Sequence, residues 1–122
     1  MLQTTQILTV HFTATHVVVG LPSWHHEAKI HGHMWQAELH LAGPGEDLAR
    51  RDWDAVERDA VLWAQETLGH RHLNEVMAGR TDEADVAVWL YEQWAPRLEY
   101  LAQVRVSARP GEWTGYTPVT GQ

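Results

Sequence analysis

The 122-residue sequence contains no cysteine. This absence excludes disulfide bonds, thiolate metal ligands and thiol nucleophiles at once. The sequence does hold nine histidines and sixteen acidic residues. Any metal ion that the chain binds must therefore be held by histidine, aspartate or glutamate side chains.

The sequence also has no long apolar run and no excess of positive charge. No segment approaches the roughly 18 apolar residues that indicate a membrane span, and residues 1–6 lack the features of a signal peptide. The formal net charge of −7 at pH 7 argues against nucleic acid or a membrane surface as a partner. We therefore expect a cytoplasmic protein with a small-molecule substrate, which can be anionic if a metal supplies a local positive charge.

The length of the chain predicts a single domain over residues 1–122 with a sizeable core. Hydrophobic residues make up 44% of the sequence, which is typical of a folded globular chain. Seven tryptophans are many for this length. We expect several of them in the core or against a pocket.

Changes in hydrophobic periodicity predict four strands and two helices. Strands are expected where apolar residues alternate with period two, and helices where the period is that of an α-helix. The expected elements are, in chain order, strands at residues 4–19 and 31–43, helices at 52–68 and 81–96, and strands at 101–108 and 113–116. The order ββααββ predicts an α+β fold in which the two helices cover one face of the sheet.

The motif His31-Gly32-His33 places two histidines on one face of the second expected strand, because side chains alternate faces with period two. His16 lies on the apolar face of the first expected strand and offers a third imidazole. Three neutral imidazoles leave a fourth position for water or substrate, which is typical of a catalytic zinc site. For each histidine taken alone, a hydrogen-bonded place in the core is the alternative.

Five short motifs occur in a fixed order along the chain. They are Phe12-x-Ala14-x-His16, His31-Gly32-His33, Leu68-x-His70-x-x-Leu73-Asn74, Ala87-Val88-Trp89, and Val104-Arg105-Val106-Ser107 with Trp113 and Tyr116. Over residues 7–117, this ordered set resembles the family of 6-pyruvoyl-tetrahydropterin and 6-carboxy-tetrahydropterin synthases.

The resemblance implies a tunnelling fold (T-fold), in which each subunit has a four-stranded antiparallel sheet with two helices on one face. It implies a homo-oligomer in which subunits form trimeric barrels, two barrels stack into a hexamer, and active sites lie at subunit interfaces. It also implies zinc as the cofactor, bound by His16, His31 and His33, and His70 as the catalytic histidine.

Three positions depart from the family pattern. Glu27 stands where the family has a cysteine, Gly69 where it has an aspartate before the catalytic histidine, and Ala108 where a glutamate anchors the pterin. Glu27 can still act as a general base beside an open metal position, although a solvated loop position is the alternative. Without the aspartate, His70 loses a partner that would fix its tautomer, and it can equally be a surface residue. Ala108 leaves pterin recognition without its carboxylate, unless another acid replaces it.

We therefore expect a zinc-dependent lyase or cyclase in which the metal polarises the substrate and Glu27 and His70 transfer protons. The expected substrate is a small molecule other than a standard pterin, as in secondary metabolism. One alternative is a glutamate-type pterin synthase that cleaves the side chain of dihydroneopterin triphosphate for folate synthesis. Another is a non-catalytic barrel that binds a metal or a ligand.

Overall fold

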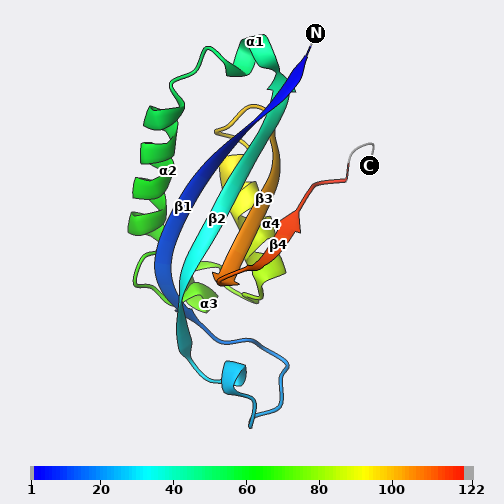
Figure 1. The fold of residues 1–122 in the computed structure, drawn as a ribbon. Coiled ribbons are helices and arrows are strands. Elements are labelled where there is room, and N and C mark those ends of the chain that lie inside the picture. The colour runs from blue at the N-terminus through cyan, green and yellow to red at the C-terminus, as the bar shows by residue number, and fades with distance from the viewer. Residues whose placement is uncertain (1, 120–122) are drawn as a thin grey trace.

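The computed structural model describes residues 2–119. Four strands form one antiparallel sheet in the order β1-β2-β3-β4 (Figure 1). The strands are β1 (Gln3–His16), β2 (His31–Pro44), β3 (Leu101–Arg109) and β4 (Glu112–Tyr116). The long helices lie between β2 and β3 in the sequence, so the expected α+β class and ββααββ order are confirmed.

Two long helices, α2 (Trp53–Thr67) and α4 (Glu83–Trp94), pack against the same face of the sheet (Figure 1). The side chain of Asp52 begins α2 by accepting a hydrogen bond from the N–H of Ala55 at 3.1 Å. Such a cap satisfies one of the backbone donors that the first turn of a helix leaves unpaired.

Three short helical turns join the larger elements. They are η1 (His26–Ala28), α1 (Gly45–Leu48) and α3 (Leu73–Val76). Periodicity did not predict them, because three or four residues are too few to show a helical repeat. No helix within residues 2–119 is long and apolar enough to span a membrane.

Strands β1 and β2 form a long hairpin whose register runs without a bulge along both strands. One face of the hairpin is buried and the other is largely exposed, as the period-two alternation predicted. The first strand ends at His16, not at residue 19 as expected. The reason is that the side chain of Asn74 bonds both the N–H and the carbonyl of Val17, at 2.9 and 3.1 Å, in place of a strand partner.

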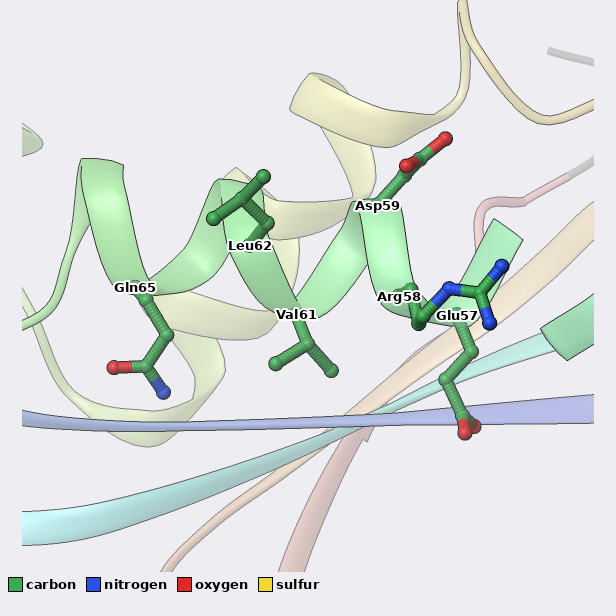
Figure 2. Close-up of a pocket in the computed structure, with 6 residues that line it drawn as sticks. All are labelled: Glu57, Arg58, Asp59, Val61, Leu62 and Gln65. Atoms are coloured by element: carbon green, nitrogen blue, oxygen red, sulfur yellow. The ribbon is translucent and has the colours of Figure 1, made fainter. Parts of the chain in front are cut away.

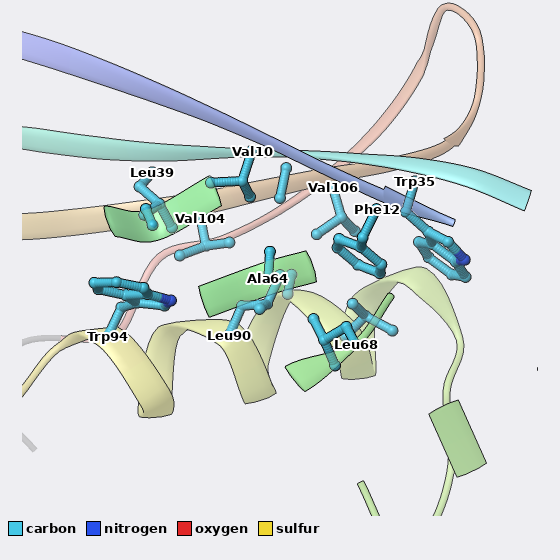
Figure 3. Close-up of a cluster of buried hydrophobic side chains, with 14 of the residues drawn as sticks. Val10, Phe12, Trp35, Leu39, Ala64, Leu68, Leu90, Trp94, Val104 and Val106 are labelled. Carbon is cyan, nitrogen blue, oxygen red and sulfur yellow. The ribbon is translucent and has the colours of Figure 1, made fainter. Parts of the chain in front are cut away.

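The core lies between the sheet and the two long helices (Figure 3). Trp35 of β2 is fully buried and stacks on Phe12 of β1, with the ring centroids 6.1 Å apart. Leu90 and Trp94 of α4 pack into the same cluster. Burying a large apolar side chain contributes roughly 1.5–3 kcal/mol. These contacts therefore fix the buried face of the hairpin against the helices.

The outer edge of β1 is covered by other parts of the chain. Glu57 of α2 accepts a hydrogen bond from the N–H of Thr9 at 3.0 Å, and Gln65 of α2 donates one to the carbonyl of His11 at 2.6 Å. Farther along this edge, the segment 70–72 pairs in parallel with β1 and bonds its backbone. The edge contacts therefore fix this segment beside the C-terminal end of β1.

Candidate metal centre

Three histidines meet where the β1–β2 hairpin leaves the sheet. His16 is the last residue of β1 and lies opposite His31, the first residue of β2. His33 lies two residues farther along β2, on the same face of the strand. The ring centroids of His16 and His31 are 4.5 Å apart, and each lies within 5.2 Å of the centroid of His33. One nitrogen from each ring lies within 4.8 Å of the other two.

Hydrogen bonds fix the tautomers of two of these rings. Nδ1 of His16 lies 2.9 Å from the backbone carbonyl oxygen of Thr81, and Nδ1 of His31 lies 2.8 Å from that of Lys29. A carbonyl oxygen only accepts, so each Nδ1 carries the proton and donates it. In both rings Nε2 is therefore left with a free lone pair.

Those two Nε2 atoms are buried and have no hydrogen-bond partner within the described residues. An unpartnered buried polar atom costs on the order of 1–3 kcal/mol, so two in one cluster need an explanation. A metal ion held by these nitrogens removes the cost. A bond from the other ring nitrogen to a backbone carbonyl is the usual arrangement of metal-binding histidines.

Burial lowers the pKa of His16, and the neighbouring His31 and His33 lower it further, while the hydrogen bond to Thr81 opposes the shift. Burial also lowers the pKa of His33, with smaller contributions from His31 and Arg109. Both rings are therefore neutral near pH 7, which is the form that binds metals. Three neutral imidazoles suit zinc, whereas calcium and magnesium prefer oxygen ligands. The residues present thus fit the expected cofactor.

A second cluster, His25, His26 and Glu27, also brings three possible ligand atoms within 4.8 Å of one another. Its chemistry differs, because Nδ1 of His25 accepts a hydrogen bond from the N–H of Glu27 at 3.1 Å. The lone pair of that nitrogen is therefore in use, and Nε2 carries the proton. The carboxylate of Glu27 is engaged as well, in an ion pair with Arg109. This cluster does not fit a metal site as the first one does.

The structure places Glu27 on η1, the turn shortly before His31. Its side chain is about three-quarters buried, which excludes a fully solvated loop position. The charges of Glu27 and Arg109 both act on the pKa of His33, in opposite directions. No sequence pattern indicates the pair with Arg109, because that residue follows a predicted strand far away in the chain.

The structure does not bring His70 to the three histidines of the same chain. His70 is exposed, adopts a left-handed backbone conformation with φ of 59°, and donates its N–H to the carbonyl of Thr13 at 2.6 Å. Within residues 2–119, no hydrogen bond or ring contact joins it to His16, His31 or His33. The edge of β1 therefore holds His70 at the surface of the chain.

The backbone explains the glycine before His70. A Cβ atom placed on Gly69 would lie 2.5 Å from the carbonyl oxygen of Gln65. Real Cβ contacts are essentially never that short, so an aspartate here would have to move the end of α2. The local backbone conformation therefore disfavours an aspartate at position 69.

Ala108 is buried and lines a pocket of about 180 Å³ at the end of β3. The lining residues are Met34, Gln36, Ser107, Ala108, Arg109 and Pro110. None of them is an acid, so no lining carboxylate replaces the one that the resemblance places at this position.

A larger hollow, of about 530 Å³, runs along one helix (Figure 2). All of its lining residues belong to α2, among them Val61 and Leu62. Two others, Glu57 and Gln65, bond the edge of β1. No histidine lines this hollow, so we place the chemistry at the histidine cluster instead.

Two further residues, which no sequence pattern marks, act on the cluster. Thr81 is fully buried and binds Nδ1 of His16. Glu83, in the first turn of α4, lies close enough to raise the pKa of both His16 and His33. Both were visible only as the start of a predicted helix, since nothing in the sequence shows which strand that start contacts.

Comparison with known proteins agrees with this fold. The family model described as 6-pyruvoyl tetrahydropterin synthase matches residues 7–119. The structure is similar to that of Caenorhabditis elegans 6-pyruvoyl tetrahydropterin synthase, with a TM-score of 0.79 and 18% identity over 98% of each chain. It is also similar to an uncharacterized protein from Wolinella succinogenes, with a TM-score of 0.68 and 13% identity over 96% of this chain and 99% of that one. No curated protein matches the sequence.

Proposed function

The chain belongs to the 6-pyruvoyl tetrahydropterin synthase family, whose model covers residues 7–119, and from this premise we propose a zinc-dependent lyase or cyclase that acts on a small molecule. Membership in this family supports a synthase-like fold and a lyase-type enzyme. We propose three further points: the zinc ion, the residues that transfer protons, and the substrate class.

One observation carries the zinc site. The Nε2 atoms of His16 and His31 are buried and unpartnered within the described residues, while each Nδ1 is held by a backbone carbonyl. With His33 as the third ligand, the donor set matches that of catalytic zinc, which keeps a position open for substrate. When bound, zinc supplies a Lewis acid that polarises an oxygen atom of the substrate.

Glu27 is the proposed general base. Its carboxylate is on the turn shortly before His31 and is held by an ion pair with Arg109. In the reaction it accepts a proton from a carbon or oxygen atom of the substrate beside the polarised group. Because most of the Glu27 side chain is already buried, a bound substrate excludes water from it easily.

We assign His70 to the site of a neighbouring copy. It is exposed, and the backbone of β1 fixes it at the outside of its own subunit. A homo-oligomer of three or six copies with active sites between subunits lets His70 exchange a proton on the far side of the substrate. Gly69 leaves it without an aspartate in the preceding position, so its tautomer depends on the neighbouring subunit or on the substrate.

The proposed substrate is not a standard pterin, because no carboxylate lines the pocket at Ala108. A site that pairs polar groups discriminates by up to about 10⁴-fold against a mismatched partner, so this absence bears directly on the substrate. The second candidate function is the glutamate-type cleavage of dihydroneopterin triphosphate. It is favoured by Glu27, which holds the position of the family's cysteine beside the histidines.

Metal analysis tests the site. The purified protein is expected to retain one zinc ion per chain after dialysis, and His16→Ala is expected to lose it. His11→Ala is the matched control, because His11 lies on the exposed face of the same strand and should leave the zinc content unchanged. Full zinc content in His16→Ala would overturn the assignment.

A substrate assay separates the two functions. Dihydroneopterin triphosphate should neither bind to nor be turned over by the zinc-loaded protein if the substrate is not a pterin. Turnover that needs both zinc and Glu27, lost in Glu27→Gln and kept in Glu99→Gln, would establish the second function instead. Glu99 is a suitable control because it also forms an ion pair with an arginine, Arg51.

A further inference from the structure

The pocket beside Ala108 carries a single charge, and that charge is positive. Arg109 is the only ionised residue among the six that line it. Of the others, Gln36 and Ser107 are polar, and the hydroxyl of Ser107 is turned to the backbone carbonyl of Arg109 at 2.5 Å. A pocket of this kind favours an anionic ligand.

The positive charge of the Arg109 guanidinium also acts on the candidate metal centre. It lowers the pKa of His33, although burial and the neighbouring His31 have larger effects. On its other side it bonds the carboxylate of Glu27. Arg109 thus joins the pocket to the proposed base.

The ion pair between Arg109 and Glu27 can be exchanged at small cost. The two side chains are 44% and 23% exposed, and ion pairs that solvent reaches are weak. A guanidinium presents a planar fork of donors that binds a carboxylate or a phosphate through two hydrogen bonds. An oxyanion of the substrate can therefore compete with Glu27 for the same donors.

We propose that Arg109 is a specificity-determining residue, which binds a carboxylate or phosphate group of the substrate in this pocket and releases Glu27 in exchange. The inference rests on the proposed function, because it takes Glu27 as the base. In the free protein the carboxylate of Glu27 is engaged by Arg109. Once the substrate's oxyanion binds the guanidinium, Glu27 is free to accept a proton. Only an anionic substrate therefore frees the base that its own reaction needs.

Nuclear magnetic resonance of the zinc-free full-length protein tests the exchange. Inorganic phosphate and acetate are added in separate titrations, with chloride at equal ionic strength as the blank. The Nε–H signal of Arg109 and the carboxyl carbon signal of Glu27 are expected to shift together and to saturate. Whichever of the two anions saturates at the lower concentration identifies the group that the substrate carries.

Arg105 supplies the matched control, because it lies on the same strand, is 35% exposed and pairs with Glu38. Arg109→Gln should weaken anion binding by about tenfold or more, read from the amide signals of Ser107 and Ala108, whereas Arg105→Gln should leave it unchanged. Arg109→Lys keeps the charge without the fork and replaces the glutamine variant if that one fails to fold.

Equal shifts at Arg105 and Arg109, a shift that does not saturate, or a Glu27 signal that stays in place would each overturn the inference. A failure here is distinct from a failure of the zinc site. The anion titrations use zinc-free protein, and zinc content is measured separately.

Discussion

The backbone carbonyl oxygen of Thr81 lies 2.9 Å from Nδ1 of His16, although the two residues are 65 positions apart. The hydroxyl of Thr81 lies 3.2 Å from the same nitrogen and 3.3 Å from Oδ1 of Asn74. Asn74 in turn holds the backbone of Val17, the residue after His16. A buried network from the second half of the chain thus orients a candidate ligand in the first half.

Thr81→Val is expected to weaken zinc binding by about tenfold at most, the low end of the usual effect of losing an outer partner, because the backbone carbonyl that accepts from Nδ1 of His16 remains. Valine keeps the shape of the side chain but removes the hydroxyl from His16 and Asn74. Competition with a chelator measures the dissociation constant. Thr81→Ser restores the hydroxyl and should recover most of the affinity, whereas an unchanged constant in the valine variant would show that the hydroxyl plays no part.

Zinc is expected to stabilise the folded chain, because only the folded chain brings the three histidines together. At a free zinc concentration 100 times the dissociation constant, the free energy of unfolding should rise by about 2.7 kcal/mol. Urea unfolding with and without a chelator measures the difference. His31→Ala should abolish the gain and His11→Ala should keep it; a gain of equal size in His31→Ala would place the zinc elsewhere.

The stability of the zinc-free protein is expected to fall as the pH drops below about 6.5, the pKa of an ordinary histidine. Burial lowers the pKa of His16 and His33 in the folded state. Between the ordinary and the lowered values, the unfolded chain therefore binds more protons than the folded one, and acid favours unfolding. Above this range the two groups contribute no pH dependence.

Urea unfolding of the zinc-free protein between pH 5 and 7.5 checks that slope. His16→Gln should flatten the decline, since glutamine does not titrate. His40→Gln, which alters a histidine paired with Glu38 on the other face of the sheet, should leave the decline in place. A decline equally steep in His16→Gln would assign it to other groups.

Gly69→Ala is expected to destabilise the fold by about 1–3 kcal/mol, the usual cost of an added group with no room. The clash is with the carbonyl oxygen of Gln65. Gly79→Ala is the matched control, because a Cβ there meets nothing within 4 Å. Urea unfolding compares the two. Equal stabilities would mean that the end of α2 moves freely, and an aspartate at position 69 would then be tolerated.

The sequence was sufficient to predict the fold because each long strand has one buried face. Alternation along β1 and β2 marks both strands and the face that carries His16. The predicted end of β1 was wrong because the bond between Asn74 and Val17 joins distant parts of the chain. No local pattern records which side chain replaces a strand partner.

The candidate site was predictable to a similar extent. The spacing of His31 and His33 and the face of His16 predicted that three rings meet, and their rings do lie together; zinc binding stays a prediction. The pair of Glu27 with Arg109 joins residues 82 positions apart. Ion pairs at that separation depend on how the loop before β2 folds back, which composition and periodicity do not encode.

All three histidines lie in one hairpin, between residues 16 and 33, and this has a consequence for how the chain folds. Contacts so close in sequence form early, because they close only a short loop. A slip of one residue between the strands would turn His31 and His33 to the opposite face from His16. Zinc present during folding would therefore bind the correctly paired hairpin alone and select against misaligned strands before the helices have docked.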